Sequence, residues 1–461
     1  MIAPRDPAVA ATLDLLRAWT PIRSVADDRG GLARMAATLS DWLVRDLGAT
    51  LVPGAAEVDP PIVHARLDIG AQRTVVLYNM YDVMPADPAG WSVDPFTGGE
   101  ADLPGLGPAF IGRGVENNKG PLAGMLVAVR HLHETGRLGV NLEILVEGQE
   151  ESGSGALRRY LATEPCPVGP ADAVLFPSLC EYGGGPPRIY LGFKGIATGE
   201  IRVEGGAWGG PAAAIHSSNA PWIANPAWRL VSALAAIAGG DTGAVGAVAL
   251  DAEAQAVTGR LAGQFDPDAE LRFRRTQRYA VNGTAEEKLA AVLATASLNL
   301  STLRTYPPDG KAVTPRAATA GFELRLPPGL DPGPVLDDIR DRLRRAGLSD
   351  GVAIELADAY PGCRFSETAT GVSALAAAYR DLGAEPRIWP WAIGSAPGYA
   401  FARVAPAFLI GGLGHGGNAH GIDEFVTLEG LSRFLHSIEG WLLQLGAPST
   451  PSSPDAPGRQ T

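Results

Sequence analysis

The 461-residue sequence contains few of the residues that usually mark a redox or structural metal site. It has only three cysteines, Cys166, Cys180 and Cys363, and no CxxC pair. An odd number of widely spaced cysteines indicates neither a disulfide framework nor a zinc knuckle. We therefore expect all three to serve as packing residues.

Excess positive charge and long apolar runs are also missing. The net charge is −12, which disfavours nucleic acid and anionic membrane as partners, because both are bound through basic residues. No run approaches the roughly 18 apolar residues of a membrane span. The first 19 residues have early acids and read as a helix, not a signal peptide. These features predict a cytoplasmic protein.

The length and the element pattern predict two domains. A chain of 461 residues exceeds one ordinary core. Helical patterns near 7–19 and 30–47 precede the strand-like runs VHARLD and TVVLYN, and helices near 121–135 and 154–163 lead to NLEILVEG and DAVLF. Strands separated by such helices predict an α/β domain with a mixed sheet between helices.

The alternation of helices and strands stops near residue 191 and resumes near residue 360. RIYLGFKGIATGEIRVEGG predicts a long strand or hairpin, and further strands and two helices follow, which predicts an inserted α+β domain over 191–359. Residues 240–295 have too weak a pattern for an assignment. Segments 1–190 and 360–446 form the first domain, and the Pro/Ser-rich tail 447–461 is predicted to be disordered.

Four polar, Gly-rich clusters follow apolar runs. They are NMYD at 79–82, GRGVENNKG at 112–120, EGQEESGSG at 147–155 and GHGGNAHGIDEF at 414–425. One such cluster alone is typical of a solvated loop. Four of them in one α/β pattern favour a shared pocket at the carboxyl ends of the strands.

In their order, these clusters resemble the motifs of the M20 family of metallopeptidases and amidohydrolases, which have a two-zinc site. The resemblance spans about residues 10–446. It implies a catalytic domain that is interrupted by a lid or dimerisation domain, and it implies a homodimer. The family's Glu-Glu pair is matched by Glu150 and Glu151, and its late His by His420. Glu150 would then be the general base and acid.

The resemblance also assigns substrate-contacting residues. His216 matches a His that reaches a partner subunit's active site, where it would be an oxyanion donor. Asn299 and Arg325 match lid positions that contact or support substrate. Gly394 and Ser395 match a turn whose NH groups can receive a carboxylate, and Asp82 matches an Asp that orients a metal-binding His. Here we expect Asp82 to bond Asn117 or substrate instead.

Three of the family's five metal-ligand positions hold other residues. Met80 replaces a His, Asn117 the bridging Asp, and Ser178 another Asp, whereas Glu151 and His420 remain. A bridging ligand needs negative charge to hold two dications together, and a thioether is a poor zinc ligand. We therefore expect no metal cofactor and a degenerate zinc site, with weak binding of a single zinc at Glu151 and His420 as the alternative.

The implied chemistry follows from this loss. Without a metal, Glu150 beside Glu151 should have a raised pKa, and plain amide hydrolysis would lose its Lewis acid. This favours metal-independent cyclisation, condensation or elimination on an amide, amidine or carboxyl group of a small amino-acid-derived substrate. Asn117, Glu151 and His420 would then contact that substrate. Two alternatives stay open, a conventional M20 hydrolase with a reduced single-metal site and a non-catalytic binding protein.

Overall fold

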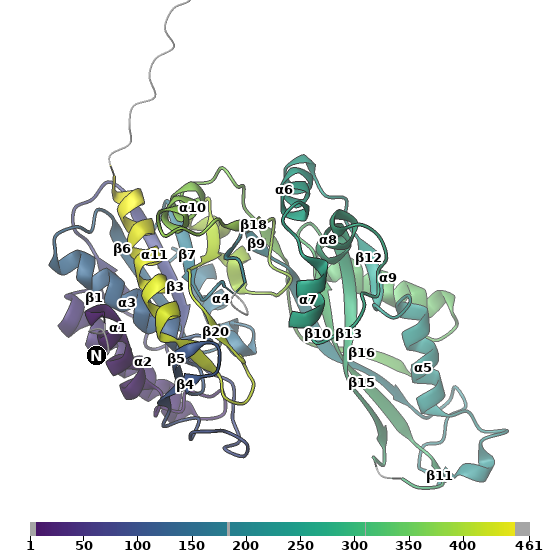
Figure 1. Cartoon of the computed structure of the whole chain (residues 1–461). Helices are drawn as coiled ribbons and strands as arrows, with labels where there is room; N and C mark the ends of the chain where they lie inside the picture. Colours follow the sequence, from purple (N-terminus) through teal and green to yellow (C-terminus); the bar gives the residue numbers. More distant parts are fainter. Residues whose placement is uncertain (1–5, 182–184, 309, 448–461) are drawn as a thin grey trace, which may run out of the picture.

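The computed structural model describes residues 6–181, 185–308 and 310–447. The predicted disordered tail lies outside these residues, apart from Ala447. The described chain forms two parts, an α/β part on one side and an elongated part with an antiparallel sheet on the other (Figure 1). Among the described residues, no helix has both the length and the apolar character that crossing a membrane requires.

The α/β part contains an eight-stranded mixed sheet. In spatial order its strands are β1 (Thr50–Leu51), β2 (Val63–Leu67), β6 (Asn141–Glu147), β3 (Thr74–Met80), β7 (Ala173–Pro177), β19 (Phe408–Gly411), β8 (Arg188–Tyr190) and β18 (Arg387–Trp389). The four central strands β6, β3, β7 and β19 run parallel. Their carboxyl ends therefore meet at one edge. The predicted α/β class with a mixed sheet is confirmed.

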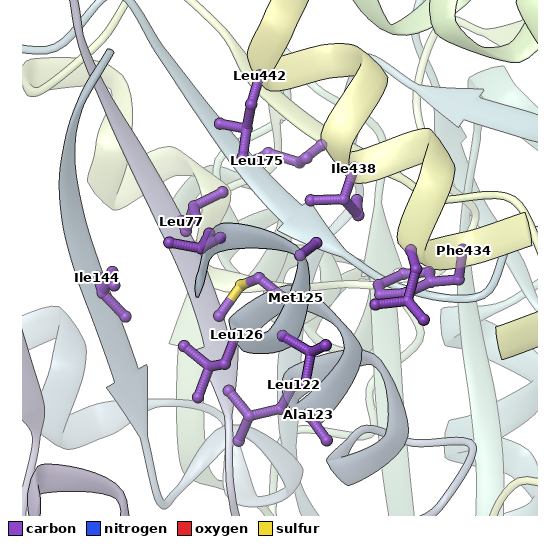
Figure 2. Packing of buried hydrophobic residues seen from close by; sticks show 14 of the residues in the cluster. Leu77, Leu122, Ala123, Met125, Leu126, Ile144, Leu175, Phe434, Ile438 and Leu442 are labelled. Atoms are coloured by element: carbon purple, nitrogen blue, oxygen red, sulfur yellow. The ribbon is translucent and has the colours of Figure 1, made fainter. Parts of the chain in front are cut away.

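Helices cover both faces of this sheet. They are α1 (Pro7–Trp19), α2 (Arg29–Leu47), α3 (Lys119–Glu134), α4 (Gly155–Ala162), α10 (Val372–Asp381) and α11 (Leu428–Gly446). Side chains alternate along β3, so that Val75 and Leu77 face one core, and Val76, Tyr78 and Met80 face the other. Figure 2 shows the first core, where α3 and α11 pack their apolar stripes on the sheet.

The inserted part is built on a five-stranded antiparallel sheet. Its order is β12 (Ala244–Ala247), β13 (Thr295–Tyr306), β15 (Ala317–Leu326), β10 (Gly195–Glu204) and β16 (Val352–Tyr360). Helices α5 (Pro226–Ile237) and α9 (Pro332–Arg345) pack on it through a separate hydrophobic core. A two-stranded sheet of β11 (Ile215–His216) and β14 (Val313–Thr314) lies at its far end (Figure 1).

The segment without a sequence assignment forms three helices. These are α6 (Ala252–Ala262), α7 (Pro267–Phe273) and α8 (Ala285–Ala294). Asp251, Asp266 and Thr284 cap their amino termini with side-chain hydrogen bonds. Leu261 and Leu293 pack into the core of the α/β part. The helices therefore bridge from the inserted part to the sheet.

The predicted long strand or hairpin after residue 187 is wrong in detail. The chain there forms β8, the two-residue β9 (Gly192–Phe193) and β10. Gly192 has φ +155°, and an added Cβ would lie 2.1 Å from the Cys363 carbonyl oxygen of β17 (Cys363–Arg364). Because of this break, the segment leaves the large sheet at β8 and enters the small sheet at β10. A further sheet of β20 (Gly416–Gly417), β21 (Phe425–Thr427), β5 (Gly107–Ile111) and β4 (Gly99–Leu103) also was not predicted.

Candidate active site

A cavity of about 830 Å³ lies between the two parts of the molecule. The loops after β6 and β7 contribute Glu150, Glu151 and Ser178, and β15 and β16 of the inserted part contribute Arg325 and Tyr360. Three of the four polar clusters of the sequence reach it, and the fourth, at 79–82, supports its floor through Asp82. The carboxyl-end position follows from the parallel strands β3, β6 and β7.

Asp82 fixes the backbone of the two cavity glutamates. Its buried carboxylate accepts hydrogen bonds from the N–H of Glu150 at 3.2 Å and of Glu151 at 3.0 Å. Burial raises the pKa of Asp82, and the nearby Glu147 raises it further, while these two bonds oppose the shift. Both Asp82 oxygens thus face the Glu150–Glu151 turn and not Asn117, whereas contact of Asp82 with substrate stays a prediction.

Glu424 fixes the backbone of the loop that carries Asn117 in the same way. Its carboxylate accepts bonds from the N–H groups of Gly114, Glu116 and Asn117, each at 2.9 Å, and forms an ion pair with Arg113 at 2.6 Å. The exposed fractions of the Arg113 and Glu424 side chains are 3% and 1%. Burial raises the pKa of Glu424 and these partners counteract it. Arg113 is therefore an internal ion-pair partner.

Asn117, Glu151 and His420 meet at one point of the cavity. His420 Nε2 lies 3.0 Å from Glu151 Oε1, and Asn117 Nδ2 lies 2.9 Å from the same oxygen and 3.1 Å from His420 Nε2. The hydrogen bond to Glu151 raises the pKa of His420. His420 has φ +62°, a left-handed conformation that is strained for a non-glycine residue. The fold thus holds the imidazole against the carboxylate.

Glu150 lines the same cavity beside this cluster. Burial raises the pKa of its carboxyl well above the usual range, and Glu151, Asp82 and Glu147 raise it further. The predicted direction of this shift is confirmed, although burial, and not Glu151, is the largest cause. A carboxyl group whose pKa is raised in this way is suited to transferring a proton.

The other two changed ligand positions have different surroundings. Met80 is 1% exposed and packs at the end of β3 in the core with Tyr78 and Phe176. Ser178 follows β7 and lines the cavity. Met80 therefore belongs to the apolar core, which suits a methionine, whereas Ser178 lies in the cavity wall.

Of the substrate positions taken from the resemblance, three lie together. Arg325 donates from Nη1 to Ser395 Oγ at 3.0 Å and pairs through Nη2 with Glu323 at 2.9 Å. Gly394 lines the cavity with them. Asn299 is exposed on β13 opposite Glu323 and is not a cavity residue. His216 is exposed at β11, at the far end of the inserted part (Figure 1), so it does not reach the cavity of its own chain.

Sequence reasoning missed the wall formed by α7 and β8. Phe273 and Arg274, at the end of α7, and Arg188 and Tyr190, on β8, line the cavity. The signal available in the sequence was the pair Asp266-Pro267, a helix start followed by the basic run RFRR. Four tryptophans flank His216 or the Gly394–Ser395 turn in the sequence, and none of them is among the described residues that line the cavity. Trp389 and Trp391 are core residues, and Trp222 and Trp228 are exposed.

The donors that remain fit one metal ion better than two. Among the described residues, no three His, Cys, Asp or Glu side chains form a metal-ligating group. Glu151 and His420 supply one carboxylate and one imidazole within 3.0 Å. Turning the Asn117 amide about its last bond would present its oxygen to the same point. This is a three-donor set with no bridging carboxylate.

Curated relatives with matching segments include dipeptidases. The Cys-Gly metallodipeptidase dug1 of Schizosaccharomyces pombe is 35% identical over 177 residues, which is 38% of this chain and 35% of that protein. The human Beta-Ala-His dipeptidase is 34% identical over 168 residues, 32% of each chain. The matched segments thus span about a third of these relatives.

Solved structures match over nearly the whole chain. The M20 family metallo-carboxypeptidase Sso-CP2 from Sulfolobus solfataricus has a TM-score of 0.80 and 25% identity, over 94% of this chain and 99% of that one. Dug1p from Saccharomyces cerevisiae, a di-peptidase, has a TM-score of 0.78 and 20% identity, over 96% and 98%. This second likeness shows the fold.

The relatives overturn part of the sequence interpretation. Two of them are named metallodipeptidases. The predictions of a metal-independent protein, a degenerate zinc site, cyclase chemistry and no cofactor were therefore wrong. The physical reason is that Met80 and Ser178 replace the ligands of only one of the two metal positions. At the other position Glu151, His420 and Asn117 still converge.

The family follows from the extent of the sequence match. The family model of peptidases M20/M25/M40 matches residues 76–444, which contain all four polar clusters and the whole inserted part. The chain therefore belongs to peptidase family M20/M25/M40.

Proposed function

We propose that this protein is a peptidase that hydrolyses the peptide bond of short peptides, with Glu150 as general base and acid. One observation carries the proposal. Glu150 lines an 830 Å³ cavity beside the Asn117–Glu151–His420 cluster, and its backbone is held by Asp82. The dipeptidase relatives favour hydrolysis over the bond-forming reactions expected at first.

The proposed roles follow the geometry. Glu151 Oε1, His420 Nε2 and the amide oxygen of Asn117 would hold a metal ion, which when bound supplies a Lewis acid for the carbonyl of the scissile bond. Glu150 would take a proton from the attacking water and return it to the leaving amine. Arg325, with Ser395, would bind the terminal carboxylate of the peptide.

The proposed partner beyond the substrate is a second copy of the chain. His216 lies far from its own cavity. Near it, the side chains of Trp222, Trp228 and Val231 on and before α5 are 50% to 78% exposed. Exposed aromatic side chains of this size favour an interface. We propose a homodimer in which His216 acts at the partner's cavity. Sedimentation of the wild type and of Trp222→Ser/Trp228→Ser tests this, and monomeric wild type would contradict it.

Hydrolysis is tested with purified protein and dipeptides. Wild type with one equivalent of Zn²⁺ should cleave Cys-Gly or Ala-Ala, and Glu150→Gln should lose this activity by roughly a thousandfold, because it cannot move the proton. Glu134→Gln, a change of an exposed glutamate on α3, is the matched control. Peptide binding without cleavage by the zinc-loaded wild type would indicate a binding protein and contradict the proposal.

A further inference from the structure

The wall of the cavity that is formed by α7 and β8 contains two arginines beside aromatic side chains. Arg188 comes from β8 and Arg274 from the residue after α7, and both line the cavity with Phe273. These elements are more than 80 residues apart in sequence. They meet because α6 and α8 pack on the core of the α/β part, and Glu270 of α7 forms an ion pair with Arg188 of β8.

Glu270 holds both guanidinium groups in place. Its Oε1 lies 2.7 Å from Arg188 Nη2, and its Oε2 lies 3.0 Å from Arg274 Nη2. Glu270 is buried, and its pair with Arg188 is shielded from water, since the Arg188 side chain is only 13% exposed. Two guanidinium groups share one carboxylate, which leaves one positive charge in excess within this group of three residues.

The field around this group is also mixed in sign. Burial and the positive charge of Arg188 lower the pKa of Arg387, on β18, whereas the negative charge of Glu270 raises it. Asp266, at the start of α7, acts in the opposite direction on Arg387. Arg188 also bonds Tyr190, and its guanidinium lies over the Trp389 ring at 5.4 Å. Arg188 is thus fixed on several sides, whereas Arg274 has 41% of its side chain exposed.

This wall is distinct from the Arg325 wall. Arg325 stands on β15 and is bound to Ser395 and Glu323. The cavity therefore offers cationic groups from two sets of elements, and the acids Glu150 and Glu151 lie in its α/β wall. One terminal carboxylate of a peptide uses one cationic group, and the exposed part of Arg274 can face another anionic group of the same substrate.

We propose that Arg188 and Arg274, held by Glu270, form a subsite for a side-chain carboxylate, so that the protein selects short peptides that contain an acidic residue. This inference rests on the proposed peptidase function. The planar guanidinium groups suit a carboxylate, and Phe273 provides apolar surface for the methylene groups of a glutamate side chain.

The test compares isosteric peptides. Binding of Ala-Glu against Ala-Gln, and of Glu-Ala against Gln-Ala, is measured by calorimetry on Zn²⁺-loaded Glu150→Gln protein, in which the peptides are not consumed. We expect roughly tenfold tighter binding of one acidic peptide than of its amide partner. Adding Arg274→Gln should reduce this ratio to about one, because the exposed half of the subsite is then neutral.

The matched control is Arg272→Gln. Arg272 lies on α7, is exposed and is absent from the cavity wall, so its removal changes the net charge equally. It should leave the ratio unchanged. Circular dichroism checks folding, and Arg274→Lys, which keeps the charge, should retain part of the preference. Equal binding of acid and amide, no measurable binding of either acidic peptide, or a ratio insensitive to Arg274→Gln would overturn the subsite.

The two proposals fail separately. Selective binding of an acidic peptide without hydrolysis by wild type would overturn the proposed function and leave the subsite. Hydrolysis with no preference between glutamate and glutamine would do the reverse.

Discussion

The two walls of the cavity are held in different ways. On the α/β side, the Arg113–Glu424 pair is almost fully buried, and its carboxylate also accepts three backbone N–H bonds. On the inserted side, Arg325 and Glu323 have side chains that are 31% and 38% exposed, and Arg325 is bound further by one hydroxyl. A buried pair is costly to break, whereas an exposed pair contributes little. The first wall is therefore a rigid frame and the second is adjustable.

The largest expected effect comes from breaking the buried pair. Glu424→Ala leaves Arg113 buried without its counter-charge and three N–H groups without an acceptor, and we expect a loss of about 3–5 kcal/mol in the free energy of unfolding. Urea denaturation measures it. Glu429→Ala, at the exposed start of α11, is the control and should cost below about 1 kcal/mol. A loss below about 1 kcal/mol in Glu424→Ala would show that the α/β wall is no more rigidly held than the wall of the inserted part.

The next effect concerns a buried carboxylate of the frame, for which the described residues supply no ion-pair partner within hydrogen-bond distance. Burial raises the pKa of Glu147, at the end of β6, to about 7, although Tyr78 donates to it at 2.6 Å. The folded state therefore binds more protons than the unfolded state between pH 4.5 and 7, and stability falls as pH rises through this window. The expected fall is about 3 kcal/mol.

Glu147→Gln should remove this contribution. Unfolding free energies at pH 5 and pH 7.5 would then differ by about 2.4 kcal/mol less than in wild type, whereas Glu134→Gln should keep the wild-type difference. Lys119, whose pKa burial lowers to about 7, adds stability as pH rises above that value. This contribution is common to wild type and Glu147→Gln, so it cancels in the comparison. An unchanged difference in Glu147→Gln would show that this carboxylate is not the cause.

Asp82→Asn tests the frame through activity. The amide oxygen accepts one of the two N–H bonds of the Glu150–Glu151 turn, and the amide nitrogen faces the other N–H. We expect a loss of about a hundredfold in kcat/KM from misplacement of Glu150, with about 1–2 kcal/mol of stability lost. Asp87→Asn, exposed in the following loop, is the control. Wild-type kcat/KM would show that Asp82 does not position the turn.

The smallest effect is expected on the adjustable wall. Glu323→Gln should change the free energy of unfolding by less than about 0.5 kcal/mol, since the lost ion pair is partly exposed. Its neutralisation frees the charge of Arg325, so KM for a dipeptide should fall about two- to threefold. Glu355→Gln on β16 is the exposed control. A stability loss comparable to that of Glu424→Ala would abolish the difference between the walls.

Local patterns predicted the elements whose cause is local. Helices at 7–19 and 30–47 and the strand TVVLYN agree with α1, α2 and β3, because apolar periodicity and caps fix them. The helices over 252–294 were not predicted, because their apolar stripes are short and pack against a sheet that is distant in the sequence. The break at Gly192 was not predicted, because it is caused by the Cys363 carbonyl, which is close in space but 171 residues away in the sequence.

The sequence by itself determined the α/β architecture, the family motifs and the acids Glu150 and Glu151, since periodicity and residue type carry that information. Only the tertiary structure decided what each charged group faces. It turned Asp82 towards two backbone N–H groups, buried Arg113 on Glu424 and brought Arg274 beside Arg188. The reason is that electrostatic partners are set by distance and burial, and neither can be read from positions along the chain.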